Sequence, residues 1–212
     1  MVMSLNTKEH TIKLISIERG IGVPVPGRND DWITHTFRYG GAALTMQTVR
    51  DCFKLDVERY VRVNFNVVSK AIDKIGGVDI ELTQAEAEHL NNAKKNYYES
   101  GSDIQTVHAG TNHLNGDTAM AYARIRKIDS DWKRIERQRT VIQAAINQVK
   151  NSDIFTLNAL ADAILPMVQT NLTKAEITRL MLEVPAFLSE GSKMEQMTIP
   201  TYETCWNSVG VD

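Results

Sequence analysis

The sequence lacks any apolar run that approaches the ~20 residues a membrane-spanning helix needs. No basic segment followed by an apolar one, as in a signal peptide, opens it. Cysteine is scarce: Cys52 and Cys205 are the two cysteines, and they lack the close spacing of metal ligands. We therefore expect two free, mostly buried thiols, and no disulfide can be argued from positions so far apart.

Several catalytic motifs are also missing. There is no G-x-x-x-x-G-K-[ST] phosphate loop, no G-x-S-x-G elbow, no H-E-x-x-H pair and no C-x-x-C pair. The five histidines are scattered, and we interpret them as surface or structural residues. His35 stands apart from the others because it follows a glycine-rich loop at residues 20–31.

What is present fits a globular protein of one domain. The 212 residues are 42% hydrophobic and 24% charged, which are ordinary values. A chain of this length can bury about 70% of its unfolded surface. The formal net charge of −2 gives no reason to expect general affinity for nucleic acids.

Strand and helix patterns alternate along the chain. Alternating or continuous apolar runs predict strands at residues 1–6, 11–17, 60–65, 78–82 and 193–199, and an extended segment at 167–172. Helical periodicity and end signals predict helices at residues 42–53, 67–75, 84–92, 116–122, 131–150, 154–165 and 173–188. Residues 20–31 are predicted as a loop and residues 110–115 as a turn. This order predicts an α/β fold, a three-layer α/β/α arrangement with a central mixed β-sheet.

Basic residues concentrate in one stretch, residues 123–139 (ARIRKIDSDWKRIERQR). Seven basic and three acidic residues give it a formal charge of +4, so the rest of the chain sums to −6. Five of its basic residues are arginines, and guanidinium matches phosphate with two parallel hydrogen bonds. The stretch predicts an anion site, most plausibly for phosphate. The alternative is a solvated basic face of a helix.

The spacing within this stretch suggests which arginines could act together. Arg124 and Arg126 would lie on one side of an extended segment but would diverge on a helix. For both to contact one diphosphate, the chain should leave its helix near Ala123. Arg134 and Gln138 are four residues apart and share a face of the helix at 131–150.

The start of that helix adds backbone N–H groups and a positive dipole end, with Asp129 or Ser130 as the predicted cap. Arg19, at the end of the strand at 11–17, could converge with Arg124 and Arg126, because ligands bind at strand ends in α/β folds. Arg137 and Arg139 are assigned surface or packing roles on the helix.

An ordered set of motifs resembles a known family. S-I-x-R, Y-G-G, I-G-G-V, L-N-G-x-x-A-x-x-Y-A-R-x-R and D-x-x-R-x-x-R-Q occur in that order. The chain is similar to the LytR-CpsA-Psr domain over residues 1 to about 150, and residues 151–212 fit its C-terminal part more loosely. We accordingly expect residues 1–150 to form the core of the domain and residues 151–212 to complete it.

The resemblance implies a domain on the extracellular face of the bacterial cytoplasmic membrane, with an anchoring helix that this chain lacks. Members bind polyisoprenyl phosphates in a long apolar pocket and use Mg²⁺. They transfer an anionic glycopolymer, such as teichoic acid or capsule, from a polyisoprenyl-pyrophosphate carrier to peptidoglycan. The implied partners are thus the polyisoprenyl (pyro)phosphate lipid and a peptidoglycan acceptor, without nucleic acid.

The resemblance also assigns residues. Those that grip the pyrophosphate in the family correspond to Arg19, Arg124, Arg126, Arg134 and Gln138, while Asp131 would orient Arg134 or an incoming hydroxyl. These six are the expected catalytic residues. Four guanidiniums and a metal would hold the diphosphate, because phosphoryl transfer depends on positioning and charge neutralisation.

The sequence departs from the family pattern in ways that favour a second hypothesis. The family's first strand and its G-R-S-D segment, which carry the metal-binding aspartates, have no counterpart here, so no metal ligand is assigned. Gly20 stands where the family has aspartate, Glu18 where it has proline, and Thr34 where it usually has asparagine. The alternative function is a non-catalytic module that binds polyisoprenyl phosphate or an anionic wall polymer. Nucleic-acid binding through the arginine stretch is a third and weaker hypothesis.

Overall fold

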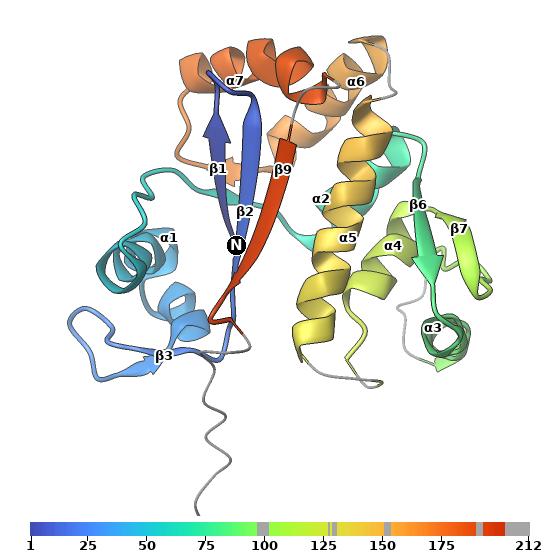
Figure 1. Cartoon of the computed structure of the whole chain (residues 1–212), viewed down its shortest axis with the longest axis horizontal. Helices are drawn as coiled ribbons and strands as arrows, with labels where there is room; N and C mark the ends of the chain where they lie inside the picture. Colours follow the sequence, from blue (N-terminus) through green and yellow to red (C-terminus); the bar gives the residue numbers. More distant parts are fainter. Residues whose placement is uncertain (97–101, 127, 129–130, 151–153, 190–192, 202–212) are drawn as a thin grey trace, which may run out of the picture. The chain divides into compact units, whose positions relative to one another are not determined.

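The computed structural model describes residues 1–96, 102–126, 128, 131–150, 154–189 and 193–201. These residues belong to two compact units (Figure 1). Unit 1 combines Met1–Val61 with Thr170–Asp212, and unit 2 is Arg62–Gln169. Each unit is described by itself, and the predicted grouping of residues 1–150 with 151–212 stays a prediction.

Unit 1 is built on a mixed sheet. Its three strands, in spatial order, are β1 (Val2–Asn6), β2 (Thr11–Ile17) and β9 (Lys193–Ile199). β1 and β2 are antiparallel, and β2 and β9 are parallel (Figure 1). The register sets Ile15 opposite both Val2 and Met197, while Leu14 points to the other face and is fully buried. The predicted α/β class with a mixed sheet is confirmed, as are these three strands.

A bent helix packs against this unit's sheet. α1 (Ile33–Phe53) follows a two-stranded ribbon of β3 (Gly22–Val23) and β4 (Asp31–Trp32). Its buried residues Ile33 and Val49 pack with Val2 and Ile17 of the sheet. The predicted start at residue 42 was too late, because Gly40 and Gly41 bend the helix instead of preceding it.

The glycine pair is required by the bend. Gly41 has a φ of 61°, which favours glycine, and a Cβ on Gly40 would lie 2.6 Å from the Cβ of Leu44. The two halves of α1 are joined across the bend by the hydroxyls of Thr36 and Thr45, which lie 3.0 Å apart. The bend therefore keeps both halves in one packed element.

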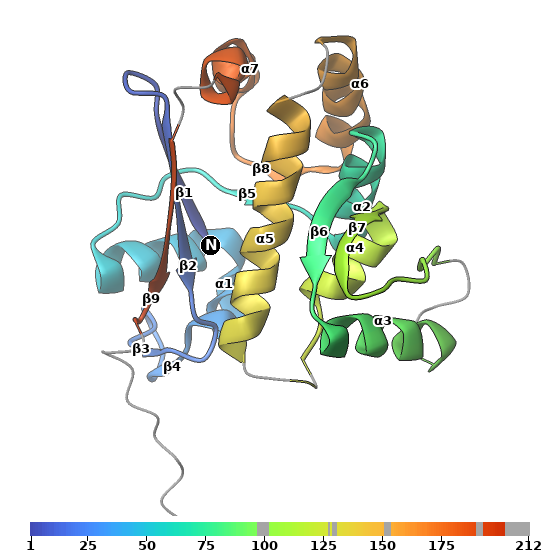
Figure 2. The same ribbon diagram turned by 45° about the vertical axis from the view of Figure 1, so that its right-hand side comes forward.

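Unit 2 contains most of the helices. Its elements are α2 (Phe65–Lys74), β6 (Val78–Leu82), α3 (Gln84–Asn96), β7 (Gly110–Leu114), α4 (Gly116–Ala123), α5 (Asp131–Lys150), α6 (Ile154–Ile164) and the 3-10 turn η1 (Leu165–Met167). β6 and β7 form an antiparallel pair, and α5 lies beside β6 and α4 in both ribbon views (Figure 2). The predicted helix at 131–150 and strand at 78–82 are confirmed at both ends.

Two predictions for unit 2 were wrong. Residues 110–115 were expected to turn, but β7 pairs with β6, because Asn112 and Leu114 are buried while Thr111 and His113 face solvent. The expected strand at 60–65 is reduced to β5 (Val61–Arg62), since the Asn64 side chain accepts the Val67 amide and caps α2.

The core of unit 2 is a single cluster of apolar side chains around β6. Val78, Ile80 and Leu82 point inward from that strand and are at most 2% exposed. They pack with residues of the helices around them, including Leu90 of α3 and Val141 of α5. In the part of the chain that the structure describes, no helix is long and apolar enough to cross a membrane.

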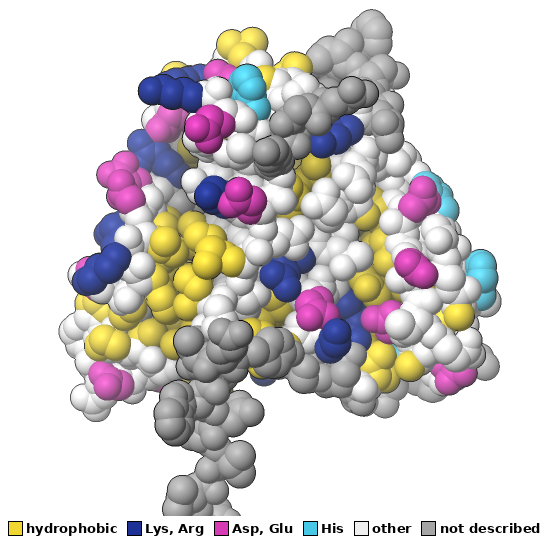
Figure 3. Space-filling view, in the orientation of Figure 1, with side chains coloured by type: hydrophobic (Ala, Val, Ile, Leu, Met, Phe, Trp, Pro, Cys, Tyr) yellow, Lys and Arg dark blue, Asp and Glu magenta, His cyan; other side chains and the backbone are white. Residues whose placement is uncertain are grey.

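Some hydrophobic surface remains exposed in unit 1. Hydrophobic side chains gather in Figure 3 where Figure 1 places β1, β2 and α1. Met3 and Met197 of the sheet are 53% and 49% exposed. Lys13 and Glu195 form an ion pair of 2.9 Å on adjacent strands of the same sheet.

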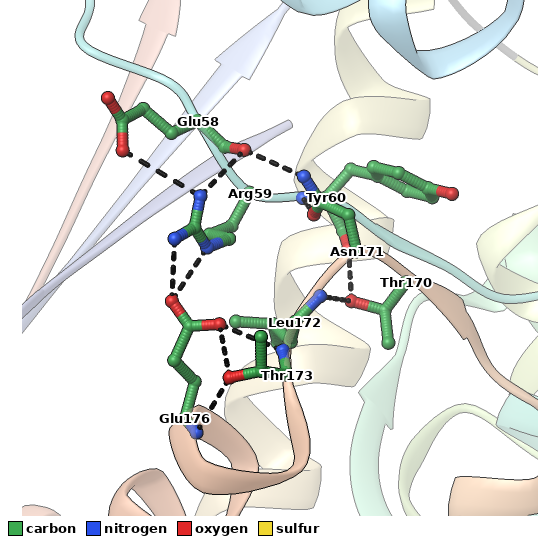
Figure 4. A network of polar contacts seen from close by, with 8 residues as sticks. All are labelled: Glu58, Arg59, Tyr60, Thr170, Asn171, Leu172, Thr173 and Glu176. Carbon is green, nitrogen blue, oxygen red and sulfur yellow. Dashed lines mark hydrogen bonds and ion pairs between the residues drawn. The ribbon is translucent and has the colours of Figure 1, made fainter.

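Two segments of unit 1 that are distant in the sequence are joined by side-chain hydrogen bonds (Figure 4). The Asn171 side chain accepts the Tyr60 amide and donates to the Glu58 carbonyl, each at 2.9 Å. One amide side chain thus satisfies two main-chain groups. The Thr170 hydroxyl donates to the Tyr60 carbonyl, next to the short strand β8 (Gln169–Thr170).

An ion pair extends this network to α7 (Lys174–Leu188). Arg59 donates to one oxygen of Glu176 through Nε at 2.8 Å and through Nη2 at 2.7 Å. The other oxygen accepts the backbone amide and the hydroxyl of Thr173, which completes a capping box (Figure 4). These hydrogen bonds, of which the one from Arg59 has the largest effect, lower the pKa of Glu176 to about 2.

The lowered pKa of Glu176 predicts a pH dependence of stability. The pKa of Glu176 is lower in the folded protein than in the unfolded chain, so the ionised carboxylate stabilises the fold at pH values above its ordinary pKa. This stabilisation is lost as the pH falls from about 4.5 to about 2. We expect the melting temperature of Glu176→Gln to fall below that of the wild type at pH 6 and to converge with it at pH 2. Thermal denaturation measured across this range, with Glu183→Gln on the same helix as control, checks the expectation. A difference that persists at pH 2 would contradict it.

Candidate functional site

Two exposed arginines follow the end of helix α4. α4 ends at Ala123, and Arg124, its C-cap, still has helical dihedral angles. Ile125 is 2% exposed, whereas Arg124 and Arg126 on either side of it are exposed. The prediction that the chain leaves the helix near Ala123 is confirmed, and the burial of Ile125 directs both arginines to solvent.

Arg124 rests on an aromatic ring. Its Cζ lies 4.6 Å from the ring centroid of Phe65, the first residue of α2. Phe65 is 56% exposed, which is unusual for such a large apolar side chain. A guanidinium in this position is attracted to the ring face and loses part of its rotamer freedom. Phe65 therefore supports the guanidinium of Arg124 at the surface.

A buried ion pair holds the main chain between the two arginines. Arg137 of α5 donates through Nε to Glu86 of α3 at 2.7 Å and through Nη1 to the carbonyl of Ile125 at 3.3 Å. Arg137 is 4% exposed and Glu86 is 8% exposed. Since Ile125 lies between Arg124 and Arg126, this pair fixes the segment that presents both of them.

The second oxygen of Glu86 is satisfied as well. It accepts the backbone amide and the hydroxyl of Thr83, each at 2.9 Å, in the capping box that starts α3. Nearby, burial raises the pKa of Tyr122 to about 12, and the negative charge of Glu86 adds to this shift. Tyr122 is therefore neutral at physiological pH, and Glu86 and Arg137 are the charged partners in this interior.

Sequence reasoning missed the role of Arg137. It was assigned a surface or packing role, but it is buried and ion-paired rather than on the surface. A usable signal was present: Arg137 lies four residues before Val141, on the face of α5 that points into the core. Arg139, also assigned a surface or packing role, is half-buried on this helix.

The other predicted residues of α5 differ in exposure. Arg134 is 6% exposed, whereas Gln138 one turn later is exposed. Asp131 is the first residue of α5, and its side chain lies outside the described residues, as do the predicted caps Asp129 and Ser130. Unit 2 thus carries Arg124, Arg126, Arg134 and Gln138 on α4, α5 and the segment between them.

Arg19 belongs to unit 1. It follows β2, its side chain is exposed, and its carbonyl accepts the amide of Thr34 at 3.3 Å. Ile21, two residues after Arg19, also bonds to the start of α1, because its carbonyl accepts the amide of Ile33 at 2.9 Å. The convergence of Arg19 with the arginines of unit 2 stays a prediction.

The expected magnesium has no position among the described side chains. No group of three or more His, Cys, Asp or Glu residues in residues 1–96, 102–126, 128, 131–150, 154–189 and 193–201 is arranged to hold a metal ion. Cys52 of α1 is a free thiol, and Cys205 lies outside the described residues. Among the side chains that the structure describes, none is assigned as a magnesium ligand, and we assign no step to the metal.

Comparison with known proteins identifies the family of this chain. The model of the LytR_cpsA_psr family matches residues 1–211. The chain belongs to the LytR-CpsA-Psr family. The resemblance found in the ordered motifs is therefore confirmed, and it extends beyond residue 150.

Two curated relatives illustrate the similarity. The polyisoprenyl-teichoic acid–peptidoglycan teichoic acid transferase TagU of Halalkalibacterium halodurans is 34% identical over 176 residues, which are 81% of this chain and 54% of the relative. The enzyme TagT of Bacillus subtilis, which has the same descriptive name, is 29% identical over 96% of this chain and 60% of its own length. The chain thus spans a little over half the length of these relatives.

Solved structures share the fold. TagT bound to LIIa-WTA has a TM-score of 0.76 and 27% identity, over 94% of this chain and 72% of that chain. The family protein YwtF (TagT) with bound octaprenyl pyrophosphate lipid has a TM-score of 0.71 and 25% identity, over 99% and 73%. Known LytR-CpsA-Psr structures therefore include one with a lipid pyrophosphate.

The buried pair in this LytR-CpsA-Psr chain gives a stability prediction. Arg137→Met leaves Glu86 buried without its partner, and we expect the free energy of unfolding to fall by about 3–5 kcal/mol. The double variant Glu86→Gln with Arg137→Met removes both charges and should recover part of that loss. Urea denaturation of the two single variants and the double variant measures the coupling.

Lys133→Met is the matched control on the same helix. Lys133 pairs with Glu136 at 2.7 Å, but both side chains are largely exposed, so its loss should cost no more than about 1 kcal/mol. If Arg137→Met were as stable as Lys133→Met, the buried pair would not fix this part of unit 2.

Proposed function

We propose that this chain provides the pyrophosphate-binding part of a glycopolymer phosphotransferase of the bacterial cell envelope. Its donor is an anionic polymer, such as teichoic acid or capsule, on a polyisoprenyl-pyrophosphate carrier, and its acceptor is peptidoglycan. The site acts at the extracellular face of the cytoplasmic membrane, where carrier and acceptor meet. The relatives' names and the lipid in the YwtF structure support this choice of substrates.

One observation carries the proposal. Arg124 and Arg126 are both exposed and flank Ile125, which is buried and whose carbonyl accepts a hydrogen bond from Arg137. Two adjacent guanidiniums on a fixed backbone can bind neighbouring phosphoryl groups of one pyrophosphate. Because the backbone is already ordered, little conformational entropy is lost on binding. A merely solvated basic face would not need a buried anchor.

The reaction requires positioning and neutralisation of charge. A hydroxyl oxygen of the acceptor attacks the phosphorus that carries the polymer, and a new P–O bond forms as the bond to the bridging oxygen of the pyrophosphate breaks. Polyisoprenyl phosphate leaves with the electron pair, and the hydroxyl proton passes to solvent. Arg124 and Arg126, with Arg134, Gln138 and Arg19 as further predicted contacts, offset the charge on the phosphoryl oxygens. Asp131 is proposed to orient Arg134 or the attacking hydroxyl.

Ligand-induced stabilisation tests the binding step. Farnesyl pyrophosphate is a soluble probe with the same headgroup as the carrier, and at a hundred times its Kd it should raise the melting temperature of the chain by about 5–10 °C. Arg124→Ala together with Arg126→Ala should abolish this rise, whereas farnesol should give none with either protein. Differential scanning fluorimetry measures all four combinations.

The matched control is Lys174→Ala together with Arg179→Ala. This double variant removes the same two positive charges from exposed positions on α7 and should keep the full rise. An unchanged melting temperature of the wild type with farnesyl pyrophosphate would refute the proposal. An assay for transfer of the polymer to glycan strands distinguishes the two functions. A transferase transfers the polymer, whereas the non-catalytic module binds without transfer.

A further inference from the structure

A histidine in unit 2 is hydrogen-bonded through both nitrogens of its ring. His113 of β7 donates through Nδ1 to Asp79 of β6 at 2.7 Å and through Nε2 to the carbonyl of Gly76 at 2.6 Å. An ionised carboxylate and a carbonyl can only accept hydrogen bonds, so both ring nitrogens must carry a proton. The geometry therefore requires the imidazolium form of His113.

A neutral His113 cannot make both contacts. It carries one ring proton, so its other nitrogen would turn a lone pair toward one of the two oxygens, and that contact would open. The hydrogen bond to Asp79, with the largest effect, and the one to Gly76 accordingly raise the pKa of His113 above its ordinary value of 6.5. The side chains of His113 and Asp79 are 56% and 66% exposed, so protons reach them directly from solvent.

The I-G-G-V motif makes room for this histidine. Gly76 and Gly77 have φ values of 88° and 95°, which favour glycine, and their amides donate to the carbonyls of Asp73 and Ile72 at the end of α2. A Cβ on Gly77 would lie 2.5 Å from Nε2 of His113. The turn therefore presents the Gly76 carbonyl to the ring and leaves the space that the ring occupies.

The charges around His113 belong to the elements that pack at this turn. Glu81 lies on the same face of β6 as Asp79, but it is opposite Thr111 in the β6–β7 register. α2 ends at Lys74, and α5 contributes the neutral amide of Gln148, which donates to the carbonyl before Gly76 at 3.1 Å. Of these charges, that of Asp79 raises the pKa of His113.

The same end of α2 also holds the start of α4. The carboxylate of Asp73 accepts the amide of Gly116 at 2.7 Å, and the hydroxyl of Ser69 donates to Asp117 at 2.6 Å. A Cβ on Gly116 would overlap the carbonyl oxygen of Ser69, so the two helices meet at backbone contact. His113, three residues before Gly116, joins β7 to this contact.

The opposite ends of the two helices carry the arginine contact. Phe65 begins α2, and Arg124, which stacks on Phe65, is the C-cap of α4. α2 and α4 are therefore antiparallel neighbours that are tied together near His113 at one end and present Arg124 at the other. The packing of this pair decides where the guanidinium of Arg124 lies.

We propose that His113 is a pH-sensitive latch, which ties the end of α2 to the β7–α4 segment when protonated and releases the Gly76 carbonyl when neutral. The bond to Asp79 is kept on release, because a carboxylate is the stronger acceptor. The latch stabilises the fold fully below pH 6.5, and this stabilisation is lost as the pH rises through the raised pKa. Release loosens the α2–α4 pair and weakens pyrophosphate binding. That consequence rests on the proposed function, whereas the latch does not.

NMR measurements on the full chain from about pH 5 to pH 9 test the latch. The Cε1–H signal of His113 should titrate with a midpoint above 6.5. The protection of the Gly77 and Gly116 amides against hydrogen exchange should fall by about tenfold across the same midpoint, because the turn loses one hydrogen bond. A midpoint at or below 6.5, or protection that does not follow it, would overturn the latch.

Variants separate the latch from a general effect of pH. His113→Gln stays neutral and should show low protection of both amides throughout the range. Asp79→Asn should move the midpoint and the fall in protection together to lower pH, and it serves if His113→Gln folds poorly. His108→Gln is the matched control, because His108 is an exposed histidine just before β7 whose main-chain groups bond to Asn112. It should keep the pH dependence of the wild type.

Farnesyl pyrophosphate measures the consequence for the arginines. We expect it to bind the wild type about fivefold more tightly than His113→Gln at pH 6 and equally at pH 9. Comparing the two proteins at each pH cancels the titration of the probe's own phosphates. An affinity ratio that stays constant while the latch titrates would overturn the coupling to Arg124. If the probe binds neither protein, the proposed function fails, and the exchange measurements still decide the latch.

Discussion

The buried ion pair between Arg137 and Glu86 is the interaction on which the arginine site of unit 2 depends. Two charges in an interior cost several kcal/mol each unless nearly all their hydrogen-bonding groups are satisfied. Here one oxygen of Glu86 takes the guanidinium and the other takes both donors of Thr83, so a helix cap becomes part of the site. Arg137 also donates through Nη1 to the carbonyl of Ile125. This hydrogen bond fixes the segment that carries the exposed arginines relative to α5.

Rigid support matters because arginine is a flexible side chain. Immobilising a free one costs about 1.5–2 kcal/mol of rotamer entropy, and a site of several arginines would lose much of its binding energy that way. The stacking of Arg124 on Phe65 and the anchoring of Ile125 remove part of that cost before any ligand arrives. Asp31 acts in the same way in unit 1, where one carboxylate orients His35 and Tyr39. In both units, a few charged groups with saturated hydrogen bonds order the groups around them.

Local sequence patterns predicted part of this arrangement. The spacing of Arg124 and Arg126 required the chain to leave its helix near Ala123, and α4 does end there. The role of Arg137 could not be reached by counting charges, since its partner Glu86 is 51 residues away and is brought near by the packing of α3 against α4 and of α4 against α5. The early start of α1 was hidden because Gly40 and Gly41 are equally compatible with a loop and a bend. Only the burial of Ile33 and Thr36 distinguishes the two.

Charge sets the arginine stretch of residues 123–139 apart from the rest of the chain. The stretch carries a formal charge of +4 in a chain of net −2, so the remainder sums to −6. Its exposed groups are screened by salt over about 10 Å, whereas a buried pair such as Arg137 and Glu86 is screened much less. Binding of an anion by the exposed arginines should therefore weaken with salt, because salt reduces their attraction without loosening the backbone that presents them.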